Sequence, residues 1–122
     1  MIYNQTLVKV ADNSGARIAK CIRTYNCSNK NGANVGDLIL VSIKQTISEK
    51  KVKKGEMYKA VVIRTRKNFK NNNGSITKFN ENAIVLLNEA LEPVGTRVFG
   101  ILLKELKYKN FLKILSMGYH II

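Results

Sequence analysis

The sequence predicts an all-β domain, built as a small barrel or a sandwich. Six or so short β-type runs follow one another at near-regular spacing, and turn-forming residues separate them. No helical pattern interrupts these runs, and barrel closure would remove the exposed edges that short strands otherwise present. With 122 residues, the chain has the length of one domain with a modest core.

Three β-type runs occupy the first part of the chain. They are residues 6–10 (TLVKV), 17–25 (RIAKCIRTY) and 38–47 (LILVSIKQTI). The first run alternates and ends at the turn cluster ADNSGA, and a loop over residues 26–37 precedes the third. In the third run, the period of two puts Ile39, Val41 and Ile43 on one face, which we expect to face the core.

Three further runs follow in the second part of the chain. They are residues 57–65 (MYKAVVIRT), 76–79 (ITKF) and 83–87 (AIVLL). The segment NNNGS lies between the first two and marks a tight turn. We expect Gly74 to supply the left-handed backbone conformation that such hairpins need.

Helical patterning occurs at the C-terminal end. Residues 104–118 (KELKYKNFLKILSMG) predict two short helices that start at Lys104 and Asn110, with Gly118 as the stop. We therefore predict one domain over residues 1–122: barrel and loops over 1–100, then a helical segment over 101–122. A basic amphipathic helix could lie on a membrane, but docking on its own barrel or a neighbour suits this length better.

The sequence contains no set of residues that supports catalysis or metal binding. The single histidine, His120, has no acidic partner nearby, and no acidic pair lies in a glycine-rich or metal-ligand context. Cys21 and Cys27 lack the second pair that a zinc site needs, so we expect two reduced thiols, with Cys21 packed in a strand. We predict that the protein is not an enzyme and has neither a metal nor a cofactor.

The net charge of +13 predicts a polyanionic partner. Like charges on a compact domain repel one another, so the excess indicates a nucleic acid or an anionic membrane surface. No run of about 18 apolar residues is present for a membrane span. Because no recognition helix, zinc finger or basic zipper is visible, and stacking aromatics are sparse, the pattern favours RNA read by backbone and shape.

The cations concentrate in residues 48–67 (SEKKVKKGEMYKAVVIRTRK). The lysines precede a strand as mobile point charges, while arginine forks bind phosphate bidentately. Arg64 and Arg66 share one face of the strand by the period of two, so we expect them to project together about 7 Å apart, a spacing comparable to that of successive phosphates. The predicted RNA-binding set consists of Lys44, which precedes this region, and of Lys51, Lys53, Lys54, Arg64, Arg66 and Lys67 within it.

The run AVVIRTRKNFKNNNGSITKFNENAIVLLN resembles the signature of a family, large-subunit ribosomal protein fourteen. Flanking pieces match in the family's order: QTLVKVADNSGAR, VGDLI, KVKKGEMYKAVVIRT and PVGTRVFG. The resemblance covers Gln5 to about Ser116. It implies a five-stranded β-barrel with short C-terminal helices, a structural part of the large ribosomal subunit that binds large-subunit rRNA and helps to form a bridge to small-subunit rRNA. It also implies contact with ribosomal protein nineteen, and a ribosome-silencing factor can dock on such proteins.

The resemblance also implies residue roles. The motif ADNSGAR is placed near rRNA, as are KVKKG and RTRK, while GTRVFG and the helix after it are placed at the bridge and silencing-factor face. The residues added by these motifs are Asn13, Ser14 and Arg17 for rRNA, and Thr96, Arg97 and Lys113 for the bridge.

Composition and the N-terminal residues bear on the compartment. Asn, Lys, Ile and Tyr are abundant, and all four have AT-rich codons, while MIYNQTLVKV shows no presequence pattern. With the bacterial-like motifs, this predicts a protein encoded and used inside an organelle, with the mitochondrial matrix favoured over a plastid or a bacterial cytoplasm. A free-standing oligonucleotide-binding barrel that works outside the ribosome is the alternative to a ribosomal protein.

Overall fold

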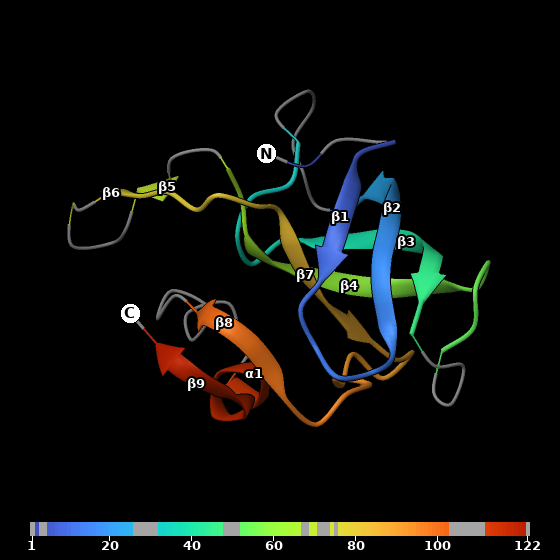
Figure 1. Cartoon of the computed structure of the whole chain (residues 1–122). Coiled ribbons are helices and arrows are strands. Elements are labelled where there is room, and N and C mark those ends of the chain that lie inside the picture. The colour runs from blue at the N-terminus through green and yellow to red at the C-terminus, as the bar shows by residue number, and fades with distance from the viewer. Residues whose placement is uncertain are drawn as a thin grey trace.

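Five strands close a β-barrel in a computed structural model that describes residues 2, 5–25, 32–47, 52–66, 69–70, 74, 76–102 and 112–121 (Figure 1). Consecutive strands pair antiparallel, and the last strand pairs parallel with the first. The barrel prediction is therefore confirmed. In barrel order the strands are β1 (Leu7–Val10), β2 (Ala16–Thr24), β3 (Leu38–Thr46), β4 (Met57–Arg64) and β7 (Ala83–Leu87).

Two smaller units accompany the barrel: a ribbon of β5 and β6, and a C-terminal unit described below. Strands β5 (Phe69–Lys70) and β6 (Ile76–Thr77) form a two-stranded ribbon that projects away from it (Figure 1). The fifth predicted run, residues 76–79, thus contributes to the ribbon and does not join the barrel, whereas the sixth, residues 83–87, forms β7. Gly74 has φ of +88°, so the left-handed conformation expected there is confirmed.

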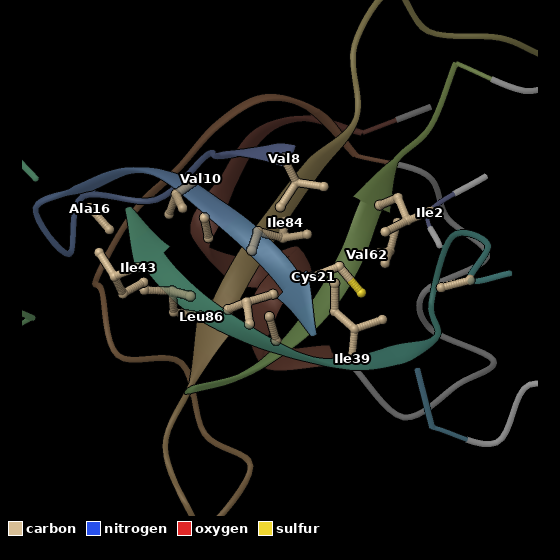
Figure 2. Close-up of a cluster of buried hydrophobic side chains, with 14 of the residues drawn as sticks. Ile2, Val8, Val10, Ala16, Cys21, Ile39, Ile43, Val62, Ile84 and Leu86 are labelled. Atoms are coloured by element: carbon tan, nitrogen blue, oxygen red, sulfur yellow. The ribbon is translucent and has the colours of Figure 1, made fainter. Parts of the chain in front are cut away.

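Aliphatic side chains from all five strands fill the barrel interior (Figure 2). Ile39, Val41 and Ile43 of β3 are fully buried, as the alternation predicted. Cys21 is buried inside this cluster, whereas Cys27 lies outside the described residues. The interior therefore follows directly from the period-two pattern of the strands.

A second apolar cluster lies between the barrel and the C-terminal unit. It joins Val61, Ile63 and Val85 of the barrel to Val98 and to other residues of the C-terminal unit, Leu102 and Ile114. Strand β7 is consequently buried along its whole length, and β4 from Ala60 onward. The outer face of β4 is thus covered by protein from Val61 onward.

The C-terminal unit contains strands that the sequence did not predict. It consists of β8 (Val98–Leu102), α1 (Leu112–Met117) and β9 (Gly118–Ile121), with β9 parallel to β8 (Figure 1). The helical segment expected over residues 101–122 therefore contains α1 but also strand residues, 101–102 in β8 and 118–121 in β9, because β9 is specified by its pairing with β8. The predicted stop at Gly118 is confirmed, and the predicted starts at Lys104 and Asn110 lie outside the described residues.

Helix α1 packs on its own barrel, as expected, since Ile114 is buried in the second cluster. Among the described residues, none of the helices is long and apolar enough to cross a membrane.

Candidate nucleic-acid interface

The turn between β1 and β2 is held from inside by Asp12. This buried carboxylate accepts hydrogen bonds from the Ser14 backbone N (3.1 Å) and hydroxyl (2.5 Å), and from the Leu86 backbone N of β7 (3.1 Å). Ser14 is itself only 2% exposed. The Ser14 side chain therefore stabilises the turn. It is not exposed on the surface where the motif implied a contact with RNA.

Asn13 points the other way and joins this turn to residues 95–97. Its Oδ1 accepts hydrogen bonds from the backbone N of Thr96 (2.7 Å) and of Arg97 (3.0 Å), and its Nδ2 donates to Thr96 Oγ1 (2.8 Å). A Cβ at Gly95 would lie 2.6 Å from Asn13 Oδ1, so the loop approaches this closely only with glycine there. Asn13, Thr96 and Arg97 are exposed and form one site, although the sequence assigned them to two.

The lysines before β4 occupy a tight turn. Lys53 N donates to Glu56 Oε1 (2.8 Å), and Gly55 N donates to the Ile43 carbonyl (2.9 Å) with φ of +89° at Gly55. Because Lys44 follows Ile43 in β3, this bond brings Lys44 to the same end of the barrel as Lys53 and Lys54. All three lysines are exposed. Lys51 lies outside the described residues.

Arg17 and Arg66 are exposed cations on the barrel exterior. The β2–β3 register shifts between Ala16 and Ile18, and Arg17 is the residue at that irregularity. Arg66 follows β4. Its backbone N donates a hydrogen bond to Asn82 Oδ1 (3.0 Å), and its Nε donates one to the Asn80 carbonyl (3.1 Å). These bonds orient the Arg66 guanidinium while it remains exposed. Lys67 lies outside the described residues.

Arg64 is buried, so the expectation that it projects beside Arg66 is wrong. It is 6% exposed, and its Nη1 donates to the carbonyls of Phe99 (3.1 Å) and Ile101 (3.0 Å) in β8. Its Nη2 lies 3.5 Å from Glu81 Oε1. Burial lowers the pKa of Arg64, and the charge of Glu81 and its hydrogen bond oppose that shift.

Two features explain the burial of Arg64. The β4–β7 register shifts between Val62 and Arg64, so the strand loses its strict alternation there. In addition, β8 covers the barrel at this point. Its Gly100 has φ of +86°, and any Cβ added there would lie 2.8 Å from Arg64 Cζ, so glycine leaves room for the arginine. Arg64 therefore fastens the C-terminal unit to the barrel.

Lys9 is a cation that the sequence analysis did not select. It is exposed in β1, and its Nζ lies 3.4 Å from Oε2 of Glu81, the same carboxylate that pairs with Arg64. The alternation of residues 6–10 places Lys9 and Leu7 on the outer face, so that pattern alone was enough to find it.

Lys113, the third residue expected at the bridge face, lies in α1. Its side chain is outside the described part of the structure, so its role stays a prediction.

One family model, described as ribosomal protein L14p/L23e, matches residues 1–122, which is the whole chain. The chain belongs to this family. The L14p/L23e chain is thus a non-enzymatic structural protein of the large ribosomal subunit and serves translation, with rRNA and ribosomal proteins as its partners. Its location is the ribosome.

Proposed function

We propose that this protein anchors large-subunit rRNA on its exposed cations and presents the Asn13–Thr96–Arg97 site toward the small subunit. The proposed rRNA-binding cations are Arg17, Lys44, Lys53, Lys54 and Arg66, together with Lys51 and Lys67 of the same motifs.

The observation that carries this proposal is the excess of exposed cations over acidic residues. Asp12, Asp37 and Glu56 each accept a hydrogen bond from a backbone N–H, and Glu81 is shared between Lys9 and Arg64. A hydrogen bond from a backbone N–H does not change the charge of a carboxylate, so the net charge of +13 still leaves the exposed lysines and arginines short of balancing negative charge. A phosphate backbone supplies that charge, and its neutralisation releases counterions.

Filter binding of the full chain to large-subunit rRNA over a salt series tests the proposal. Each lost phosphate contact reduces the slope of log affinity against log salt by about 0.7–0.9. We expect such a reduction for Arg66→Gln and for Lys53→Gln. The matched control is Lys59→Gln, which removes an exposed cation of β4 that lines a groove with Glu56 and Glu89 and should not change the slope. Unchanged slopes for Arg66→Gln and Lys53→Gln would refute the proposed surface.

The intersubunit part of the proposal rests on the exposed Thr96 and Arg97, which Asn13 holds in place. We propose that this face contacts small-subunit rRNA, that a silencing factor can compete for it, and that ribosomal protein nineteen is a neighbour on the large subunit. Large subunits that carry Arg97→Gln should join small subunits less completely in sucrose gradients at limiting magnesium. Wild-type joining with this variant would refute the assignment, and Lys59→Gln again serves as control.

The compartment that we propose is the mitochondrial matrix, with a plastid or a bacterial cytoplasm as the alternatives. Support comes from the abundance of Asn, Lys, Ile and Tyr. Detection of the chain by mass spectrometry in purified mitochondrial large subunits, and not in cytoplasmic ribosomes of the same cells, is the expected result.

A further inference from the structure

A hollow of about 520 Å³ lies on the barrel exterior over β1 and β2. Its apolar lining includes Leu7 and Ile18, and its cations are Lys9, Arg17 and Arg66. This volume is within the range of about 300–1,000 Å³ that is usual for sites that bind small organic groups. The hollow is therefore large enough for one nucleotide.

Strand pairing builds the apolar part of this hollow. Lys9 of β1 is paired with Ile18 of β2, and Leu7 lies two residues before Lys9 on the same face. Leu7 is 61% exposed, although β1 contributes Val8 and Val10 to the core. A large aliphatic side chain is thus held open to solvent between cations.

The charge in the hollow is positive. Glu81 is the carboxylate that lines it, and its two oxygens already face Lys9 (3.4 Å) and Arg64 (3.5 Å). Arg17 and Arg66 remain exposed at its border, and the Nε bond to Asn80 orients Arg66. An anion entering the hollow meets these two guanidinium groups, which bind phosphate oxygens in pairs.

We propose that the hollow receives one unstacked nucleotide of RNA, with its base against Leu7 and Ile18 and its phosphate on Arg17 and Arg66. Two other occupants fit less well. A phosphate alone would leave the aliphatic lining without an apolar contact, and an apolar protein segment would bury the cations without partners. A nucleotide combines an apolar base face with an anion, and RNA loops and bulges supply such unstacked bases. The proposal rests on the proposed rRNA binding and adds a base-contacting site to it.

The first test is an NMR titration of the full chain with three probes: AMP, adenosine and ribose 5-phosphate. We expect AMP to shift the amide signals of Leu7, Lys9 and Ile18 at lower concentration than either of the other two. Leu7→Ser should weaken AMP binding about ten-fold, to the level of ribose 5-phosphate, because it removes the apolar contact and no charge. Ile76→Ser, at an equally exposed isoleucine outside the hollow, should leave AMP affinity unchanged.

Equal affinity for AMP and ribose 5-phosphate would overturn the proposal, because it would show a purely electrostatic surface. So would equal affinity for AMP and adenosine, or shifts confined to other parts of the chain.

The second test uses assembled large subunits that carry a photo-cross-linking amino acid in place of Leu7. A cross-link to rRNA is expected, and a cross-link to a ribosomal protein would overturn the proposal in favour of a protein occupant. Leu7→Ser leaves the charge intact, so the salt slope of rRNA binding reports separately on the proposed function. A normal slope with no AMP site would refute the nucleotide hollow alone.

Discussion

Arg64 and Arg66 are two residues apart and carry the same charge, but the same substitution should affect different properties at the two positions. At Arg64 it should lower the stability of the fold, and at Arg66 it should weaken the salt dependence of rRNA binding. We consider Arg64→Met with Arg66→Met as the matched control. The first substitution removes the two hydrogen bonds from Nη1 to the β8 carbonyls of Phe99 and Ile101. The second removes an exposed side chain with one bond to the Asn80 carbonyl.

The magnitude follows from the burial of Arg64. Hydrogen bonds from a charged donor contribute about 1.5–3 kcal/mol each, and the pair with half-exposed Glu81 adds less than about 1 kcal/mol. Methionine also relieves a cost, because Arg64 Nε is buried without a hydrogen-bond partner among the described residues. That relief is about 1–3 kcal/mol, so we expect a net loss of about 2 kcal/mol. For a chain of this size, the loss lowers Tm by about 8 °C.

Thermal unfolding followed by circular dichroism measures the stability difference, and the rRNA salt series measures the charge difference. Arg64→Met should lower Tm and leave the salt slope unchanged, whereas Arg66→Met should shift Tm by less than about 2 °C and reduce the slope. Arg64→Lys, which keeps the charge but loses the fork, should lower Tm almost as far as Arg64→Met. Equal Tm values for the two methionine variants, or a reduced slope for Arg64→Met, would contradict the fastening role of Arg64.

Three further outcomes are expected. Asn13→Ala removes three hydrogen bonds to residues 96 and 97, so it should cost about 1–3 kcal/mol in urea unfolding and speed amide hydrogen exchange at Thr96; unchanged exchange would contradict the link. Leu91 has φ of +60° and is 44% exposed, so Leu91→Gly should raise stability by up to about 1 kcal/mol, and a lower Tm would show that its side chain matters more than its backbone. Burial, followed by the charge and hydrogen bond of Glu56, raises the pKa of Tyr58. The folded state therefore holds this proton more tightly than the unfolded chain, and the associated stability is present below pH about 10 and lost as the pH rises further. Urea unfolding at pH values from about 9 to 11 should show a smaller loss for Tyr58→Phe than for wild type, and an equal loss would contradict the shift.

The parts of the fold that depend on neighbouring residues could be predicted from the sequence. Alternation in residues 38–47 identified the buried face of β3, and Gly74 and Gly118 marked a turn and a helix end because their chemistry acts locally. The parallel strand β9 could not be predicted this way, since residues 118–121 become a strand only against β8.

The candidate site divides along the same line. Exposed cations such as Lys53 and Lys54 were found from charge alone, whereas Arg17 came from the family resemblance. The burial of Arg64 depends on a register shift and on β8, which lies more than thirty residues further along the chain. The bonds between Asn13 and Thr96 span 83 positions, so no local pattern reveals them.

The parallel pairing of β1 with β7 determines the order in which parts of the fold can form during translation. Translation releases the chain from its N-terminus, and β2, β3 and β4 can pair antiparallel with their sequence neighbours as they appear. The barrel closes only when Ala83 and Ile84 have been synthesised and can pair with β1. The hydrogen bonds of Asn13 likewise require Thr96. The lysine turn between β3 and β4 is therefore complete early, while the face proposed to meet the small subunit is completed last. A chain that is interrupted after β4 would carry the lysine turn proposed to bind rRNA, but it would lack Arg66 and the surface proposed for subunit joining.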